Sequence, residues 1–227
     1  MLLNITLPKS NITLPISKEV VSIRPFTVKE EKILMLAQEE VNIESIIAAI
    51  DQIISNCTFN VHNIKTLCKI DAEYLYLQLN IKSNGGGYDV RGICKECKEK
   101  TPLTLDYTTA IVTNADNKLD AIELFDNVWV KLRYPTIEES LQVSGKDGIY
   151  AIAMILDSII EGEDVKNCKD FSMEERIEFI ESLTSVQIAK FDVVVDKFPS
   201  LLLEHNFTCK CGKENTIKIE GIERFFL

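Results

Sequence analysis

Two pairs of cysteines are the residues of this chain whose type and spacing best fit a chemical role. The first pair is Cys94 and Cys97, in the stretch CKEC, and the second is Cys209 and Cys211, in the stretch CKCG. Each pair lies between strand-like segments, as in a metal-binding knuckle, where a tight turn brings two thiolates to one ion. Together the pairs offer the four sulfurs of a closed structural zinc site, so the sequence predicts one zinc ion per chain.

Two other interpretations of these cysteines stay open on sequence alone, namely unpaired structural thiols and a redox dithiol. A redox CxxC normally begins a helix, whose dipole lowers the thiol pKa, whereas the strand-like residues 101–105 follow CKEC here. His205, four residues before Cys209, could supply a ligand in place of a sulfur, although its surroundings favour an ordinary strand position. We favour zinc with a role in stability, because four sulfurs leave no position for a catalytic water.

The remaining cysteines, Cys57, Cys68 and Cys168, have no partner at metal spacing. We expect them to be small buried hydrophobic residues with reduced thiols.

The rest of the chain offers no recognisable catalytic site. Its two histidines, His62 and His205, lie in no motif that pairs a nucleophile with a base. The three glycines at 85–87 are not followed by the helix start and lysine of a phosphate-binding loop. The sequence therefore predicts a binding or assembly protein and not an enzyme.

The composition is that of an ordinary globular protein, with 46% apolar and 26% charged residues among 227. The formal net charge of −10 argues against a nucleic-acid partner, because binding phosphates needs a surplus of lysine and arginine. The longest apolar run, at 150–160, is interrupted by Asp157 and is far shorter than the roughly 20 residues of a membrane-spanning helix. We expect a cytosolic protein with no membrane partner.

Some of the helices and strands that must position the cysteines can be predicted from the sequence. Residues 1–26 consist of short β-branched runs separated by prolines, which predict an edge ribbon of strands. Four capping boxes, which begin at Thr27, Thr136, Ser172 and Thr184, each precede an apolar-periodic run. The predicted helices span 27–39, 43–55, 136–144, 147–161, 172–182 and 185–198.

Residues 71–83 fit two patterns. Their leucines alternate as in a strand, but Asp71 is a good N-cap and Leu75, Leu79 and Lys82 would align on a helix, which we favour. Further strands are predicted on both sides of each cysteine pair and at 127–134.

These elements predict an α+β fold, with a helical body, small antiparallel β elements and a zinc-ribbon-like module made from the two distant cysteine knuckles. We expect a single compact unit over residues 1–227. Its expected parts are a β ribbon at 1–26, a helical region at 27–87, a β and zinc-knuckle module at 88–134 and 205–227, and a helical insertion at 135–204.

Two apolar segments are candidate contacts for a protein partner. Phe225, Phe226 and Leu227 either pack on the chain's own core or anchor in a partner's groove, where aromatic side chains often dominate binding. Arg24 and Phe26 could form a surface patch, although packing of Phe26 against the helix that follows is the favoured interpretation.

Several blocks of the sequence together resemble the bacteriophage baseplate protein family. They are RPFTVKEEKIL at 24–34, CKIDAEYLYLQLNIKSNGGG at 68–87, the CKEC pair and LRYPTIEES at 132–140. The resemblance implies a late protein of contractile-tail morphogenesis in the host cytoplasm, either a baseplate hub component or a chaperone-like hub-assembly factor absent from the finished particle. Its partners would be other hub or tape-measure proteins, and it implies no catalytic residues.

Two alternative functions remain. One is a zinc-ribbon adaptor in transcription, which normally needs a basic face around the knuckles, and five lysines lie there: Lys95, Lys98, Lys100, Lys210 and Lys213. The other is a thiol oxidoreductase.

Overall fold

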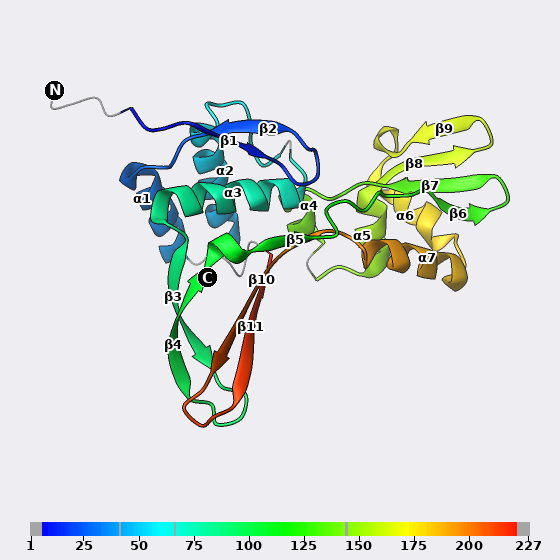
Figure 1. Cartoon of the computed structure of the whole chain (residues 1–227). Helices are drawn as coiled ribbons and strands as arrows, with labels where there is room; N and C mark the ends of the chain where they lie inside the picture. The colour runs from blue at the N-terminus through cyan, green and yellow to red at the C-terminus, as the bar shows by residue number, and fades with distance from the viewer. Residues whose placement is uncertain (1–5, 41, 66, 144, 222–227) are drawn as a thin grey trace. The chain divides into compact units, whose positions relative to one another are not determined.

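The structure is a computed structural model that describes residues 6–40, 42–65, 67–143 and 145–221. It confirms a mixed fold of helices and small antiparallel sheets (Figure 1). By its internal contacts the chain divides into two compact units: unit 1 comprises residues 1–115 and 200–227, and unit 2 comprises residues 116–199.

Unit 1 combines three helices with strands from both ends of the chain. The helices are α1 (Val28–Glu39), α2 (Ile43–Cys57) and α3 (Lys69–Asn84). The strands are β1 (Ser10–Thr13), β2 (Val20–Ile23), β3 (Gly87–Ile93), β4 (Lys100–Asp106), β5 (Ile111–Thr113), β10 (Ser200–Thr208) and β11 (Glu214–Glu220), and a short 3-10 helix, η1, spans Tyr107–Thr109. They form the pairs β1–β2 and β3–β4 and the sheet β11–β10–β5.

Unit 2 is a four-stranded antiparallel sheet packed against helices. The sheet order is β6–β7–β8–β9, from strands β6 (Ile122–Phe125), β7 (Val128–Leu132), β8 (Leu156–Glu161) and β9 (Asp164–Asn167). The helices are α4 (Ile137–Gln142), α5 (Gly148–Ile155), α6 (Met173–Glu181) and α7 (Ser185–Val195), with a short 3-10 helix, η2, at Cys168–Asp170. Buried residues from β6, β7, β8, α5, α6 and α7 form one hydrophobic core.

The ambiguous segment is a helix, as favoured from the sequence. Leu75, Leu77 and Leu79 are each at most 1% exposed, so α3 is buried on several sides and its apolar residues follow no single helical face. Gly85 ends the helix with φ of +80°, a left-handed conformation that glycine adopts without steric cost.

The predicted helix at 147–161 is wrong in its second half. Helix α5 ends at Ile155, and strand β8 begins at the next residue and pairs with both β7 and β9. The run Ser158 to Ile160 fits an interior strand as well as a buried helix, and the partner strands decide between them. The sequence prediction also missed β5, β6 and β9, which are short.

The division into units differs from the single compact unit and the helical insertion at 135–204 that the sequence suggested. Strands β6 and β7 belong with unit 2, because β7 pairs with β8 inside that unit. The chain leaves unit 1 after β5 and returns at β10, and Thr113 and Ser200 at these two points are paired in one sheet.

The first helix of each unit begins with the same arrangement of three side chains. In unit 1, Arg24 follows β2, and its guanidinium donates to both carboxylate oxygens of Glu30 at 2.6 and 3.1 Å. The Glu30 carboxylate also accepts the backbone N–H of Thr27 at 2.7 Å. One carboxylate therefore caps α1 and holds the arginine that ends the preceding strand.

Unit 2 repeats this arrangement after β7. Arg133 donates to both carboxylate oxygens of Glu139 at 2.6 and 2.8 Å, and Glu139 accepts the backbone N–H of Thr136 at 2.9 Å. Both sites share the pattern Arg-x-x-Thr-x-x-Glu directly after a strand that ends in a buried aliphatic residue, Ile23 or Leu132. The capping boxes predicted at Thr136, Ser172 and Thr184 are all present.

Candidate metal centre

Two antiparallel hairpins of unit 1 carry the four cysteines. In the first, β3 pairs with β4 from Gly87–Asp106 to Ile93–Lys100, and in the second, β10 pairs with β11 from Leu202–Glu220 to Thr208–Glu214. Figure 1 shows the hairpins side by side, extending away from the helices with their turns together at the far end. Segments about 110 residues apart in the chain thus meet at one point.

The cysteine sulfurs gather at these turns as the sequence predicts. The Sγ atoms of Cys94 and Cys211 are 3.8 Å apart, those of Cys97 and Cys209 are 3.6 Å apart, and all four lie within 4.8 Å of one another. Four sulfurs placed tetrahedrally about 2.3 Å from one zinc ion would be separated by about 3.8 Å. The spacing therefore fits a metal site with four cysteine ligands.

The backbone of each turn holds its pair of thiols in place. The N–H of Cys94 donates to the carbonyl of Glu99 at 3.0 Å, and the N–H of Cys209 donates to the carbonyl of Lys213 at 2.9 Å. Gly212 has a φ of +84°, in agreement with the positive φ expected from its place after the second pair.

Asn215 on β11 supports the site, and no local pattern in the sequence points to it. Its side chain is buried and donates to Cys94 Sγ at 3.5 Å and to the carbonyl of Lys213 at 3.0 Å. Its amide oxygen accepts the N–H of Lys95 at 3.0 Å. One side chain thus joins the two cysteine turns and orients a sulfur, as residues behind a metal ligand often do.

The two thiols of the first cysteine pair differ in pKa. Hydrogen bonds from the N–H groups of Cys97 and Glu96, together with Asn215, lower the pKa of the Cys94 thiol to about 6. At Cys97, the N–H of Glu99 lowers the pKa, but hydrogen bonding with the Cys211 and Cys209 thiols outweighs it and raises the pKa to about 12. Thiols that share protons in this way release them when they bind a metal ion.

A glycine allows the two hairpins to approach each other. A Cβ atom on Gly92 of β3 would lie 2.7 Å from the Cδ1 atom of Leu103 and 2.8 and 2.9 Å from ring atoms of Phe207 on β10. The Phe207 ring thus packs directly on the backbone at Gly92. A glycine inside a strand pattern often marks a place where another group packs closely on the backbone, so the sequence alone could have indicated this contact at Gly92.

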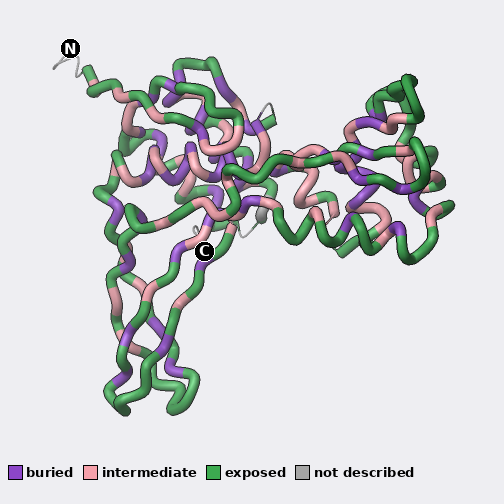
Figure 2. Tube along the Cα trace, turned by 45° about the vertical axis from the view of Figure 1, so that its right-hand side comes forward, coloured by how far each residue is buried: buried purple, intermediate pink, exposed green. Residues whose placement is uncertain are grey.

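The site is half-buried. Cys94 and Cys209 are buried, whereas Cys97 and Cys211 are exposed. Figure 2 shows buried and exposed positions next to one another near the turns of these hairpins. His205 lies within β10 opposite Ile217 and is not in the cysteine cluster.

The other cysteines are mostly as expected. Cys57 and Cys168 are buried, while Cys68 is partly exposed. Burial raises the pKa of the Cys57 and Cys68 thiols to about 12, so both are poor nucleophiles.

The structure describes two of the predicted partner-binding residues, Arg24 and Phe26. Phe26 is 7% exposed, which agrees with packing inside unit 1, and its N–H donates to Ser83 Oγ at 2.9 Å. Arg24 is held by Glu30, as described above. Contact of Arg24 and Phe26 with a partner stays a prediction. Phe225, Phe226 and Leu227 lie outside the described residues.

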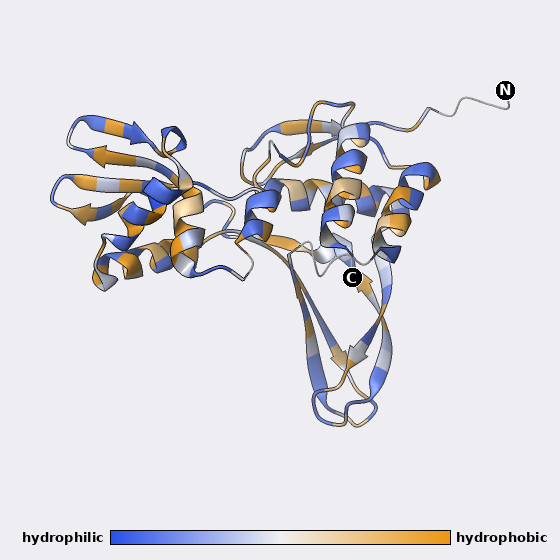
Figure 3. Cartoon of the chain, turned by 180° about the vertical axis from the view of Figure 1, so that it is seen from behind, coloured by the Kyte–Doolittle hydropathy of each residue, from blue (hydrophilic) through white to orange (hydrophobic). Residues whose placement is uncertain are grey.

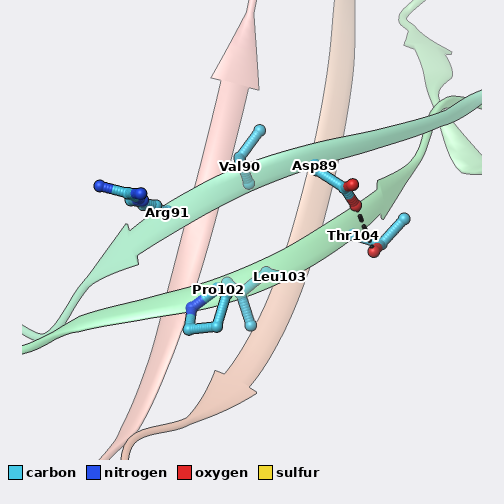
Figure 4. Close-up of a pocket in the computed structure, with 6 residues that line it drawn as sticks. All are labelled: Asp89, Val90, Arg91, Pro102, Leu103 and Thr104. Atoms are coloured by element: carbon cyan, nitrogen blue, oxygen red, sulfur yellow. Dashed lines mark hydrogen bonds between the residues drawn. The ribbon is translucent and has the colours of Figure 1, made fainter.

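A shallow pocket on the β3–β4 hairpin is lined by three cross-strand pairs: Asp89–Thr104, Val90–Leu103 and Arg91–Pro102. Thr104 Oγ1 donates to Asp89 Oδ1 at 2.7 Å, and Arg91 points away from that carboxylate (Figure 4). No nucleophile and base meet among these six residues, so the cysteine site is the stronger functional candidate.

Comparisons with known proteins point to one family. The family model described as T4 bacteriophage base plate protein matches residues 7–227, which cover both units and all four clustered cysteines. Neither the curated proteins nor the solved structures contain a significant match. None of the helices in the described residues has the length and apolar character to cross a membrane.

Proposed function

This chain belongs to the T4 bacteriophage base plate protein family, and we propose that it acts as a baseplate hub component or hub-assembly factor. The family match over residues 7–227 carries the proposal, because it supports a structural or assembly role in the phage baseplate. The chain would act in the host cytoplasm during contractile-tail assembly, as a chaperone-like binder of other hub or tape-measure proteins.

The cysteine site would support this role by holding the two hairpins together around one zinc ion. The ligands would be Cys94, Cys97, Cys209 and Cys211, which use every position of a tetrahedral ion. The site would therefore supply stability and shape and no reaction.

The first cysteine pair is poorly arranged for redox catalysis. A catalytic thiol must be both exposed and easily ionised. Here Cys94, whose pKa is lowered, is buried, and Cys97, which is exposed, has a raised pKa. In the first pair, therefore, neither thiol is both exposed and easily ionised, which favours a structural role for it.

The charge around the knuckles gives little support to a nucleic-acid adaptor. Residues 87–106 hold four basic and four acidic side chains, and residues 200–221 hold three of each, so the two hairpins are formally neutral. The lysines at the tip alternate with glutamates and form no surplus that could neutralise phosphates.

The test is affinity purification of the tagged chain from infected cells, with mass spectrometry of its partners and of finished particles. A baseplate hub or assembly protein should co-purify hub or tape-measure proteins, and loss of the chain should reduce the number of complete tails. Presence in particles at fixed stoichiometry would identify a structural component, and absence from particles an assembly factor. Normal tails without the chain would overturn the proposal.

A further inference from the structure

The sheet of unit 2 has one face covered by helices and one face that carries an apolar row. Ile122 and Val130 are buried in the core formed with α5, α6 and α7, and Ile159, which is paired with Val130 on β8, packs against that core. Side chains that alternate with core residues along a strand point to the opposite face.

On that opposite face, Glu123, Trp129, Ile160 and Val165 are paired in succession across all four strands. Directly paired residues lie on the same face and in contact, so these four form one continuous row, which we call the outer row. The outer row runs from β6 to β9, the two edge strands of the sheet.

Two of the large apolar side chains in the outer row are exposed to solvent. Val165 is 65% exposed and Trp129, the only tryptophan of the chain, is 37% exposed. All four residues of β9 are exposed, and Figure 3 shows a hydrophobic stretch on this otherwise hydrophilic strand. Tryptophan is among the residues that most often dominate the energy of protein interfaces. The row therefore has the character of a contact surface and not of a solvated sheet face.

An acidic end adjoins the row. The β6–β7 and β8–β9 turns lie together, because the N–H of Gly162 donates to the carbonyl of Asn127 at 2.9 Å. Asp126 and Glu163 lie in these turns and Asp164 is the first residue of β9, and all three are exposed. Lys166 on β9 pairs with Glu161 at 3.3 Å and so neutralises a neighbouring carboxylate, not one of these three.

Most of the negative charge of the chain is in unit 2. Residues 116–199 contain 18 acidic and 9 basic side chains, a formal charge of −9, while the rest contains 17 and 16, a charge of −1. A second copy of this surface would be repelled, since like charges would face each other, and so would nucleic acid. A basic protein segment is the complementary partner.

We propose that the outer row and its acidic end bind an extended basic segment of another baseplate protein, which adds to β9 as a fifth strand. Alternate apolar side chains of this segment would continue the row beyond Val165, and its lysines or arginines would lie against Asp126, Glu163 and Asp164. The proposal rests on the proposed function for the identity of the partner, but not for the chemistry of the surface.

A peptide that can add to β9 as an extended strand tests the proposal directly. The probe is a peptide of about four Lys-Val repeats, with a Glu-Val peptide of equal length and apolar content as its control. Binding of the Lys-Val peptide should give a saturating heat signal in titration calorimetry, and the Glu-Val peptide should give none. Raising NaCl from about 50 mM to about 500 mM should weaken binding roughly tenfold or more.

Two matched variants locate the binding site. Val165→Glu places a charge in the row and should weaken Lys-Val binding roughly tenfold or more. Val193→Glu makes the same change on α7, where the valine is 55% exposed, and should have no effect. No response to the Lys-Val peptide, an equal response to both peptides, or equal weakening by both variants would overturn the proposal.

Complementation in infected cells separates this proposal from the proposed function. If the chain with Val193→Glu restores complete tails and the chain with Val165→Glu does not, the surface acts in assembly. If both restore them, the surface is not used and the inference fails while the proposed function stands. If tails form without the chain, the proposed function fails, and the peptide titration still decides whether the surface binds a basic strand.

Discussion

The two units begin alike and are held together differently. Each starts its helical part with an Arg-x-x-Thr-x-x-Glu arrangement after a hairpin. Unit 2 then builds a core in which a four-stranded sheet packs on three helices. Unit 1 has buried residues around α3, but its β3–β4 and β10–β11 hairpins extend beyond them, and towards the tips only scattered positions are buried.

This difference agrees with a structural role for the four clustered cysteines. A two-stranded hairpin is marginal in water by itself, and a sheet needs a hydrophobic face or a covering helix to be stable. Unit 2 has that cover, and the distal hairpins of unit 1 have instead a Phe207–Gly92 contact, Asn215 and four convergent sulfurs. A metal ion held by these sulfurs would take the place of a core where there is too little apolar surface to form one.

Metal removal should produce the largest difference in stability between the two units, because it should affect unit 1 and leave unit 2 unchanged. A thiolate zinc site contributes on the order of 10 kcal/mol of apparent free energy, and the distal hairpins have little else to hold them. Chelation should abolish hydrogen-exchange protection at 87–106 and 200–221. Trp129 emission, which reports on unit 2, should stay unchanged.

The metal content provides the matching control. The purified protein should contain one zinc ion per chain, and Cys94→Ser should reduce that content and reproduce the loss of protection. Metal-free protein with an unchanged melting temperature would refute the zinc assignment and remove this difference between the units.

The sequence predicted the features of this comparison that depend on local spacing. Each cysteine pair sits in its own turn, and each of the boxes at Thr136, Ser172 and Thr184 lies within four residues, so short patterns were enough. Strand β8 was missed because Leu156–Glu161 follows an apolar helix without a break, and only its pairing with β7 makes it a strand. Asn215 was missed because its contact with Cys94 spans 121 residues, which no local pattern encodes.

Gly92→Ala tests whether the hairpins of unit 1 depend on close packing. The new methyl group would overlap Phe207 and Leu103, and overpacking of this kind costs about 1–3 kcal/mol. We expect a lower melting temperature and weaker zinc binding in a competition assay with a chelator. Gly87→Ala, on the same strand, is the control, because its Cβ would meet only Thr104 at an ordinary 3.7 Å. Equal effects of the two substitutions would show that the approach at Gly92 is unimportant.

The shared Arg–Glu arrangement can be compared between the units with one substitution in each. In the native chain the Glu30 side chain is 7% exposed and the Glu139 side chain is 22% exposed, so Arg24→Gln removes the partner of the more buried carboxylate and Arg133→Gln that of the better hydrated one. We expect losses of about 2 and about 1 kcal/mol in the free energy of unfolding, although Arg133 also gives up a bond to the Met154 carbonyl. Arg91→Gln on the exposed face of β3 should cost little. The reverse order in denaturant titrations would mean that burial of the glutamate does not set the strength of the pair.

The pH dependence of these pairs is the smallest expected difference. Burial alone would raise the pKa of Glu30, but hydrogen bonds from Arg24 and Thr27 outweigh it and hold the pKa below its ordinary value of 4.5. Hydrogen bonds from Arg133 and Thr136 lower the pKa of Glu139 in the same way. A lowered folded-state pKa gives stability that is present above pH 4.5 and is lost as pH falls through the lowered value.

The stability advantage of the native chain over Glu30→Gln should therefore shrink between about pH 5 and pH 3, since the variant has no carboxylate there to protonate. Glu139→Gln should show the same trend with a smaller amplitude, because Glu139 is more exposed and its charge is better screened by water. Thermal melts of the three proteins across this range measure both trends. A stability advantage that is constant with pH would show that Glu30 acts through its hydrogen bonds and packing and not through its charge. The Arg24–Glu30 and Arg133–Glu139 pairs would then differ less in electrostatic stabilisation than the exposure of their glutamates indicates.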